Sequence, residues 1–113
     1  MSEIKDEITY DDFSKIDLKV GKVLNAEQLE GYKKILKLEV DIGERKIEIM
    51  SGLAKHYGPG EIVGKNVIVC TNLAPRKFGE KTSNGMLLAA TNEDGKPIPL
   101  TVLSDTRAGS PIT

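Results

Sequence analysis

Alternation of apolar and polar residues predicts most of the elements in this chain of 113 residues. In residues 36–42 every second side chain is apolar, which is the period of a strand with one buried face. Residues 47–49 repeat the alternation after a Gly43-Glu44 step that suits a tight turn. The pattern therefore predicts a hairpin whose first strand buries Leu36, Leu38, Val40 and Ile42.

Residues 17–24 form a second alternating segment, in which the apolar positions change phase. Val20 and Val23 cannot lie on the same face of a regular strand, because they are an odd number of positions apart. Gly21 and Lys22 lie between them, and a glycine at such a change is typical of a β-bulge. We expect a bulge there to bend the strand, as a small barrel requires.

Two short helices are predicted outside the strands. Residues 8–16 carry apolar side chains at helical spacing, and Thr9 suits the N-cap position. One or two turns are expected there, packed against the protein through Phe13. A second helical piece is expected to end near Gly58 and Pro59, since proline cannot continue a helix and glycine caps one well.

The remaining strands complete a small barrel. Residues 66–70 are apolar on both faces and predict a buried strand, and residues 85–90 predict another after a polar, basic loop at 73–84. Residues 97–103 predict a sixth strand, whose prolines suit only the edge of a sheet. Three strands, a short helix and two more strands is the order of a five-stranded OB-fold barrel, so an all-β fold is expected.

A single domain in three parts is expected: an acidic N-terminal segment with a short helix (1–16), the barrel (17–91) and a C-terminal extension (92–113). The extension follows the fifth strand but still carries apolar residues, namely Ile98, Leu100, Val102 and Leu103. A closed small barrel has little room for them, so we favour burial against a second copy of the chain. The alternative is that the extension caps the open end of the barrel.

Charge is unevenly distributed, although the net charge is only −1. Residues 1–30 hold eight acidic and four basic side chains, whereas residues 31–113 hold nine acidic and twelve basic ones. This balance excludes a protein that coats DNA generally and leaves room for a local patch that binds an anionic ligand. The single Cys70 and the single His56 argue against a disulfide framework and a metal centre, and no cofactor is expected. No signal peptide or membrane segment is evident, so a cytoplasmic location is expected.

Aromatic residues beside clustered cations supply the candidate chemistry. Tyr32 and Phe78 each lie in a predicted loop directly beside basic residues. Cations fix phosphates while flat rings stack on unpaired bases, so this pairing is typical of nucleic-acid recognition. The alternative for the lysines is a solvated strand face. The sequence supplies no matched set of acid, base and nucleophile, so an enzyme is not expected. The candidate binding residues are Lys33, Lys34, Arg76, Lys77, Phe78, Lys81, Ser83 and Asn84.

Four segments together resemble a known family. They are NLAPRKFGEKTSNGMLLAA (72–90), DLKVGKV (17–23), KLEVDIGERKIEIMSGLA (37–54) and PGEIVGKNVIV (59–69). The resemblance is to the tRNA-binding domain shared by free-standing structure-specific tRNA-binding proteins, the C-terminal domain or β subunit of methionyl-tRNA synthetase, and endothelial monocyte-activating polypeptide. It covers about residues 8–112.

The resemblance implies an OB-fold homodimer that grips the outer elbow of folded tRNA by shape and catalyses nothing. It implies contacts to tRNA from Lys34, Arg76, Lys77, Ser83 and Met86, although Met86 suits a core position equally well. It further implies a β subunit of methionyl-tRNA synthetase, which raises the hold of the synthetase on tRNA in trans. The alternative is a dimeric chaperone or peptide-binding module, like the secretion-associated branch of the family. Met1 and the family-like ending GSPIT favour a complete polypeptide.

Overall fold

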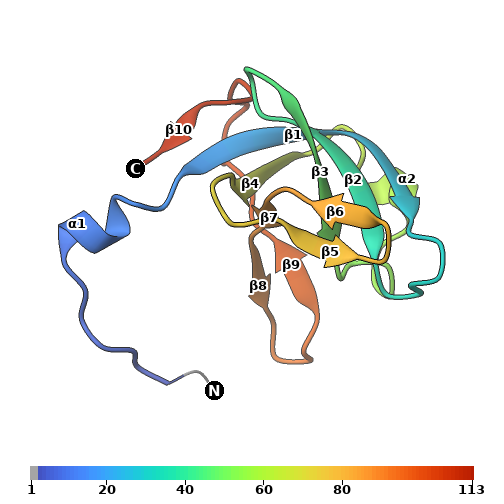
Figure 1. Ribbon diagram of the computed structural model, residues 1–113, viewed down its shortest axis with the longest axis horizontal. Coiled ribbons are helices and arrows are strands. Elements are labelled where there is room, and N and C mark those ends of the chain that lie inside the picture. The colour runs from blue at the N-terminus through green and yellow to red at the C-terminus, as the bar shows by residue number, and fades with distance from the viewer. Residues whose placement is uncertain (1–2) are drawn as a thin grey trace.

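One long strand, β1, organises the fold in the computed structural model, which describes residues 3–113 (Figure 1). Residues 1 and 2 of the predicted N-terminal segment lie outside the described residues. β1 pairs antiparallel with β2 on one side and with β4 on the other. The sheet has six strands, and five of them, in order across it, are β3 (Lys46–Ser51), β2 (Leu36–Asp41), β1 (Leu18–Gln28), β4 (Asn66–Cys70) and β7 (Met86–Leu87).

The sheet curves until its two edges meet, so it is nearly closed into the OB-like barrel that the sequence predicts. Backbone and side chain both join the edges: the Asn84 N–H donates to the Glu48 carbonyl at 2.9 Å, and the Met50 N–H donates to Ser83 Oγ at 2.9 Å. The predicted hairpin is present, and its alternating apolar residues form the centre of the core. The side chains that are almost fully buried include Leu36, Leu38, Val40, Ile42, Ile49, Val67 and Val69.

The bulge in β1 lies two residues beyond the predicted position. The register of β1 against β2 shifts between Val23 and Asn25, whereas Gly21 and Lys22 pair regularly. Gly21 faces the inside of the barrel, where a Cβ atom would lie only 2.5 Å from Val40 Cγ1. The glycine therefore serves close packing inside the barrel and not a break in the strand.

The apparent change of phase in β1 has a different cause, which is the C-terminal segment. Val20 is buried on the outer face of β1, because the chain returns there: its N–H donates to the Ser110 carbonyl at 3.0 Å, and Gly109 N–H donates to its carbonyl at 2.7 Å. The last strand, β10 (Pro111–Ile112), then pairs with the beginning of β1. Part of the predicted extension therefore covers the barrel of its own chain.

The N-terminal helix has the predicted cap but not the predicted packing. In α1 (Tyr10–Phe13) the Asp12 N–H donates to Thr9 Oγ1 at 3.1 Å, as an N-cap requires. No residue of α1 is buried, and Phe13 is 42% exposed. The expectation that the helix packs through Phe13 is thus wrong for the single chain, in which no side chain of α1 is buried.

The second helix begins where the sequence analysis expected one to end. α2 (Pro59–Ile62) starts at Pro59, and the Gly58 N–H before it donates to the Glu61 carboxylate at 2.7 Å. Proline suits the first helical position because its missing N–H would have no partner there in any case. The helix lies after Pro59 and not before it because this position places the Ile62 side chain in the core.

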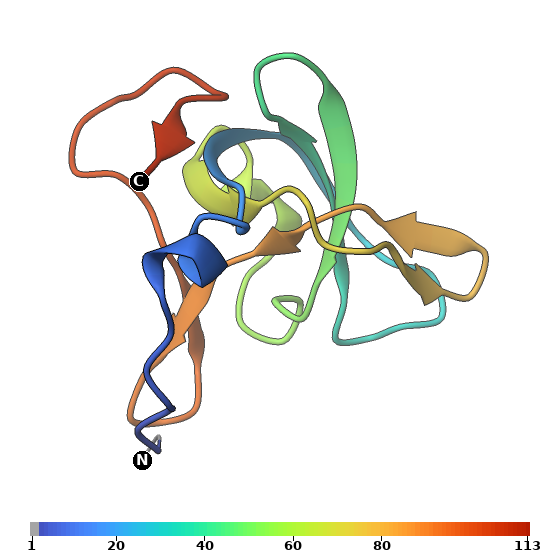
Figure 2. The same ribbon diagram turned by 60° about the vertical axis from the view of Figure 1, so that its left-hand side comes forward.

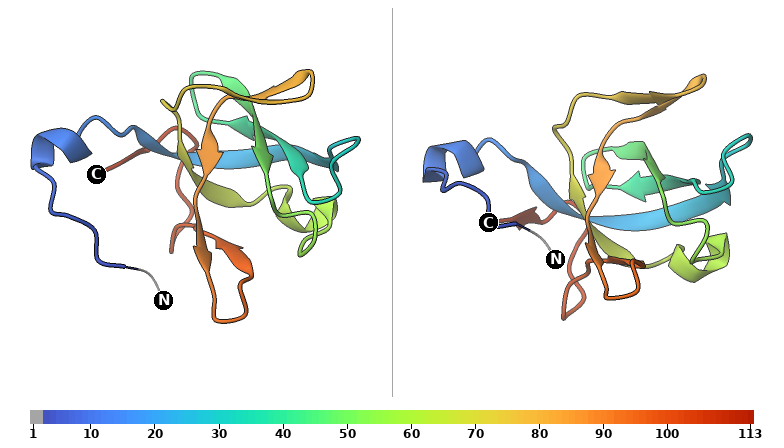
Figure 3. Two further views of the ribbon diagram at one scale, coloured as in Figure 1. Left: turned by 60° about the horizontal axis from the view of Figure 1, so that its bottom comes forward. Right: turned by 90° about the horizontal axis from the view of Figure 1, so that it is seen from below.

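Two hairpins stand outside the sheet, and the sequence analysis predicted neither as such. The predicted loop at 73–84 contains β5 (Arg76–Phe78) and β6 (Lys81–Ser83), which pair with each other. The predicted strand at 85–90 breaks after β7, and its second part, β8 (Ala89–Thr91), pairs with β9 (Pro97–Pro99). Figure 3 shows the two hairpins on opposite sides of β1. The predicted sixth strand thus joins β8 and not the edge of the main sheet.

The chain itself covers the apolar residues of the extension only in part. Ile98 and Leu100 are 38% and 40% exposed, and Leu103 is fully exposed. The barrel therefore leaves apolar surface of the extension exposed. No helix within residues 3–113 has the length and apolar character needed to cross a lipid bilayer.

The packing around Gly21 gives a direct test of the barrel interior. In Gly21→Ala the new methyl group would lie 2.5 Å from Val40 Cγ1 and 3.2 Å from Val69 Cγ2, so both valines must move. We expect the free energy of unfolding to fall by about 1–3 kcal/mol, measured by urea denaturation. Gly52→Ala is the matched control, because no atom lies within 4 Å of a Cβ there. Equal stability of the two variants would contradict the packing described for Gly21.

Candidate nucleic-acid interface

The two basic segments selected from the sequence lie side by side at one end of the barrel. The loop at residues 29–35 follows the end of β1, and the tip of the β5–β6 hairpin lies beside it (Figures 1 and 2). Tyr32 of the loop contacts Phe78 of the hairpin, with ring centroids 6.1 Å apart. The basic side chains brought together here are all exposed, and they are Lys33, Lys34, Arg76, Lys77 and Lys81.

Backbone hydrogen bonds fix the shape of the 29–35 loop. The Leu29 N–H donates to the Ile35 carbonyl at 2.9 Å, and the Tyr32 N–H donates to the Leu29 carbonyl at 3.0 Å. The Ala54 N–H also donates to the Lys34 carbonyl at 3.1 Å, which ties the loop to the segment after β3. Leu29 is buried beneath the loop. The two lysines are therefore carried by a backbone with a defined conformation.

The β5–β6 hairpin presents its cations on both faces. Arg76 and Phe78 lie on one face and Lys77 on the other, because side chains alternate along a strand. The Arg76 guanidinium lies 5.3 Å from the centroid of the Phe78 ring, within the range of a cation–π contact. Gly79 forms the turn with a φ of 65°, a left-handed conformation that favours glycine.

Lys37 differs from the five basic residues grouped at this end, because it forms an ion pair. Among the ion pairs formed within residues 3–113, none involves the five basic residues grouped at this end. Lys37, by contrast, lies 2.6 Å from the Glu27 carboxylate. The hydrogen bond from Lys37, followed by its charge and that of Lys81, lowers the pKa of Glu27, and the same bond raises the pKa of Lys37. The pair is charged at neutral pH and is lost when the pH falls through the lowered pKa of Glu27 or rises through the raised pKa of Lys37.

Ser83 and Asn84 lie at the base of the hairpin, and their side chains differ in accessibility. Ser83 is only 5% exposed, and its hydroxyl accepts from the Met50 N–H and donates to the Gly85 carbonyl. This geometry favours a structural role for Ser83 over a direct contact with RNA. The Asn84 side chain is exposed, while its backbone joins β3 at Glu48.

Met86 lies on the surface, beside the end of β1 that is opposite the 29–35 loop. It is 46% exposed, which excludes a core position, and it lines an apolar groove with Ile16, Leu73 and the buried Cys70. Through Cys70 this groove lies beside Leu18, at the beginning of β1. The 29–35 loop follows the other end of this 11-residue strand, whereas the β5–β6 hairpin begins at Arg76, only three residues after Leu73. The structure therefore separates Met86 from the lysines of the 29–35 loop.

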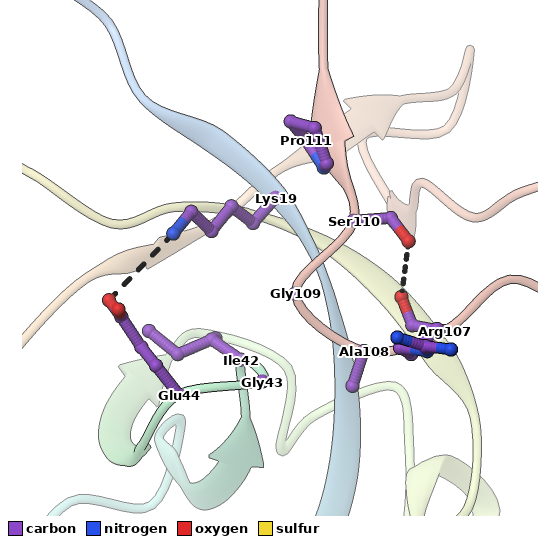
Figure 4. A pocket seen from close by; sticks show the side chains of 9 residues that line it. All are labelled: Lys19, Ile42, Gly43, Glu44, Arg107, Ala108, Gly109, Ser110 and Pro111. Atoms are coloured by element: carbon purple, nitrogen blue, oxygen red, sulfur yellow. Dashed lines mark hydrogen bonds and ion pairs between the residues drawn. The ribbon is translucent and has the colours of Figure 1, made fainter.

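A further hollow of about 480 Å³ lies between the β2–β3 turn and residues 107–111 (Figure 4). Lys19 within it is engaged by Glu44 at 3.8 Å, and Ser110 Oγ donates to the Arg107 carbonyl at 2.7 Å. The hollow contains none of the residues selected from the sequence. Within residues 3–113, no three His, Cys, Asp or Glu side chains gather in a way that could hold a metal ion.

Two features of the site were missed by the sequence analysis: the β5–β6 hairpin and the neutralisation of Lys37. The hairpin had a signal, because Gly79 and Glu80 separate two triplets of equal length in the manner of a tight turn. The pairing of Lys37 with Glu27 depends on the register of β1 against β2, in which the two residues are direct partners. That register is shifted by the bulge, so sequence alone could not supply it.

A nearly closed OB-like barrel with exposed cations on two adjoining loops is typical of nucleic-acid-binding modules. Residues 18–111 match the family model described as "Putative tRNA binding domain". The chain belongs to this tRNA-binding domain family.

Similar proteins place the chain beside methionyl-tRNA synthetases. It is 47% identical over 108 residues to the methionine-tRNA ligase of Caldanaerobacter subterraneus subsp. tengcongensis, covering 96% of this chain and 17% of that enzyme. It is 52% identical over 93 residues to the ligase of Methanoregula boonei, covering 82% and 14%. The chain thus spans less than a fifth of the curated relatives that it matches.

Solved structures of small proteins match the chain over their full length. A MetRS-related protein from Pyrococcus horikoshii superposes with a TM-score of 0.89 at 37% identity, covering 96% of this chain and all of that one. The chaperone CsaA from Picrophilus torridus superposes with a TM-score of 0.86 at 28% identity, covering 95% of this chain and all of that one. Both agree with the barrel described above.

The Glu27–Lys37 pair gives a test of the electrostatics at this surface. Glu27→Gln should free Lys37 beside the basic loops and raise the affinity for tRNA roughly two- to fivefold at low salt, with the gain shrinking as salt screens it. Filter binding at two salt concentrations measures this. Glu93→Gln, on the turn between β8 and β9, removes the same charge elsewhere and should have no effect. An unchanged affinity in Glu27→Gln would show that tRNA does not approach this side of β1.

Proposed function

We propose that this protein is a non-catalytic, cytoplasmic homodimer that binds tRNA by shape. It acts in trans as the β subunit of methionyl-tRNA synthetase and raises the hold of the catalytic subunit on tRNA. The observation that carries the proposal is the group of five exposed, unpaired cations on two adjoining loops of residues 3–113. The likeness to ligase domains and to a MetRS-related protein of the same size supports it.

Binding is electrostatic in this proposal. Lys33 and Lys34 neutralise phosphates on one side of the site, and Arg76, Lys77 and Lys81 neutralise phosphates on the other. Each neutralised phosphate releases counterions, so the affinity falls steeply as salt is added. Asn84 lies at the base of the hairpin, where its exposed amide is available to ribose or phosphate oxygens. Because the loop backbones are fixed, the cations match a folded RNA whose phosphates are fixed as well.

The homodimer is supported by apolar surface that the single chain leaves uncovered. Ile98, Leu100 and Leu103 of the extension are exposed, and so are Ile16 and Leu73 in the groove beside Met86. Large apolar side chains gathered on one surface are typical of a contact between subunits. In the dimer a second copy covers this surface, and two basic ends become available to one tRNA.

A dimeric chaperone or peptide-binding module is the second candidate function. The apolar groove beside Met86, of about 390 Å³, favours it, since an unfolded peptide would dock through apolar side chains. The likeness to the Picrophilus torridus chaperone also supports it. In that case the groove binds the ligand and the basic loops contribute nothing.

The leading proposal is tested by titrating the protein with three ligands at two salt concentrations. Folded tRNA should bind most tightly, an unstructured RNA of equal length more weakly, and an unfolded polypeptide least. Sedimentation of the free protein at micromolar concentration should give twice the chain mass of 12.3 kDa. Equal affinity for the two RNAs would contradict recognition by shape, and a purely monomeric protein would contradict the homodimer.

Arg76 distinguishes the two candidate functions. Arg76→Ala should weaken tRNA binding by about 1 kcal/mol or more, in line with a charge-assisted contact to phosphate, and should leave peptide binding unchanged. Arg45→Ala is the matched control, because Arg45 lies at the β2–β3 turn in an ion pair with Glu44. If Arg76→Ala binds tRNA as tightly as the control, the basic hairpin is not the binding surface.

A further inference from the structure

The tip of the β5–β6 hairpin is attached to the 29–35 loop by side-chain packing alone. Among the hydrogen bonds and ion pairs within residues 3–113, none joins residues 29–35 to residues 76–81. The hairpin is anchored at its base, where Ser83 and Asn84 bond to β3. Its strands are three residues long, and a two-stranded hairpin of that size is marginally stable on its own. The position of its tip therefore depends on what it touches.

Tyr32 makes that contact in two ways. Its ring meets the ring of Phe78 at an interplanar angle of 81° with centroids 6.1 Å apart, which is the favoured edge-to-face arrangement. Its hydroxyl lies over the turn, since a Cβ atom at Gly79 would be 3.3 Å from Tyr32 Oη. One side chain thus covers both the last residue of β5 and the turn that follows it.

Two side chains contact the Phe78 ring. Tyr32 packs against it, and the Arg76 guanidinium lies 5.3 Å from its centroid. Phe78 is half-buried in consequence. A ring engaged in this way offers little surface to an unpaired base, in contrast to the stacking role expected from the sequence. Its contacts instead set where Arg76 points relative to the 29–35 loop.

We propose that Tyr32 and Phe78 are positioning residues, whose contact joins the two basic loops into one surface of fixed spacing and so determines selectivity for folded RNA. The consequence for RNA rests on the proposed function, whereas the contact itself does not. A folded tRNA holds its phosphates at fixed distances and requires the cations to match them. An unstructured RNA adjusts to any arrangement of the same charges, so it gains nothing from the contact.

The proposal is tested with Tyr32→Ala, Phe78→Ala and the double variant. Each single change should weaken tRNA binding between about twofold and tenfold, the range expected for an aromatic pair. The double variant should bind tRNA no more weakly than either single variant, since both changes remove the same contact. Affinity for an unstructured RNA should stay unchanged in all three. Tyr32→Phe keeps the ring and should bind tRNA nearly as the parent protein does. Tyr10→Ala is the matched control, because Tyr10 is an exposed tyrosine on α1.

Losses that multiply in the double variant would overturn the proposal, because they would show two rings acting independently on the RNA. Equal losses for tRNA and for unstructured RNA would overturn it as well. A second measurement needs no RNA: hydrogen exchange of the β5–β6 amides should speed up severalfold in Tyr32→Ala, while β2 amides remain protected. Unchanged exchange would refute the contact even if Arg76→Ala loses tRNA. Conversely, faster exchange in a protein that binds no tRNA would refute the proposed function and leave the contact standing.

Discussion

The close packing of core side chains against β1 at Gly21 is the constraint on which the rest of the structure depends. Gly21 has no side chain, so Val40 and Val69 from the two neighbouring strands can meet over it. This lets a single strand pair with β2 and β4 while the sheet curves around a small core. Both the 29–35 loop and the C-terminal segment take their positions from this strand, one from each of its ends.

Elements were predicted correctly where the local pattern of apolar residues matches their burial in the barrel. Residues 36–49 were predicted correctly because alternation along the hairpin coincides with burial of every apolar side chain on one face. Pro59 was misread because proline suits either side of a helix boundary, and the core contact of Ile62 decides between them. Val20 suggested a bulge because its cover is the C-terminal segment, some 90 residues further along the chain. Such long-range partners leave no local pattern.

The candidate site was predictable in its residue types and not in its arrangement. Charge and aromatic content selected two segments, and the structure groups their five cations at one end of the barrel. The family resemblance, however, added Ser83 and Met86 to the site. Strand geometry separates them: Ser83 turns inward to close the barrel, and Met86 pairs with Cys70 near the far end of β1.

The 29–35 loop is held by its own backbone and by the buried Leu29, and its two lysine side chains take no part in either. Within these seven residues, the backbone and Leu29 serve folding, and the lysine side chains serve the proposed recognition. The charges at Lys33 and Lys34 can be exchanged or reversed without disturbing the scaffold. The barrel is accordingly a suitable framework for redesign toward other ligands, in which affinity is tuned on the loop while stability stays with the strands.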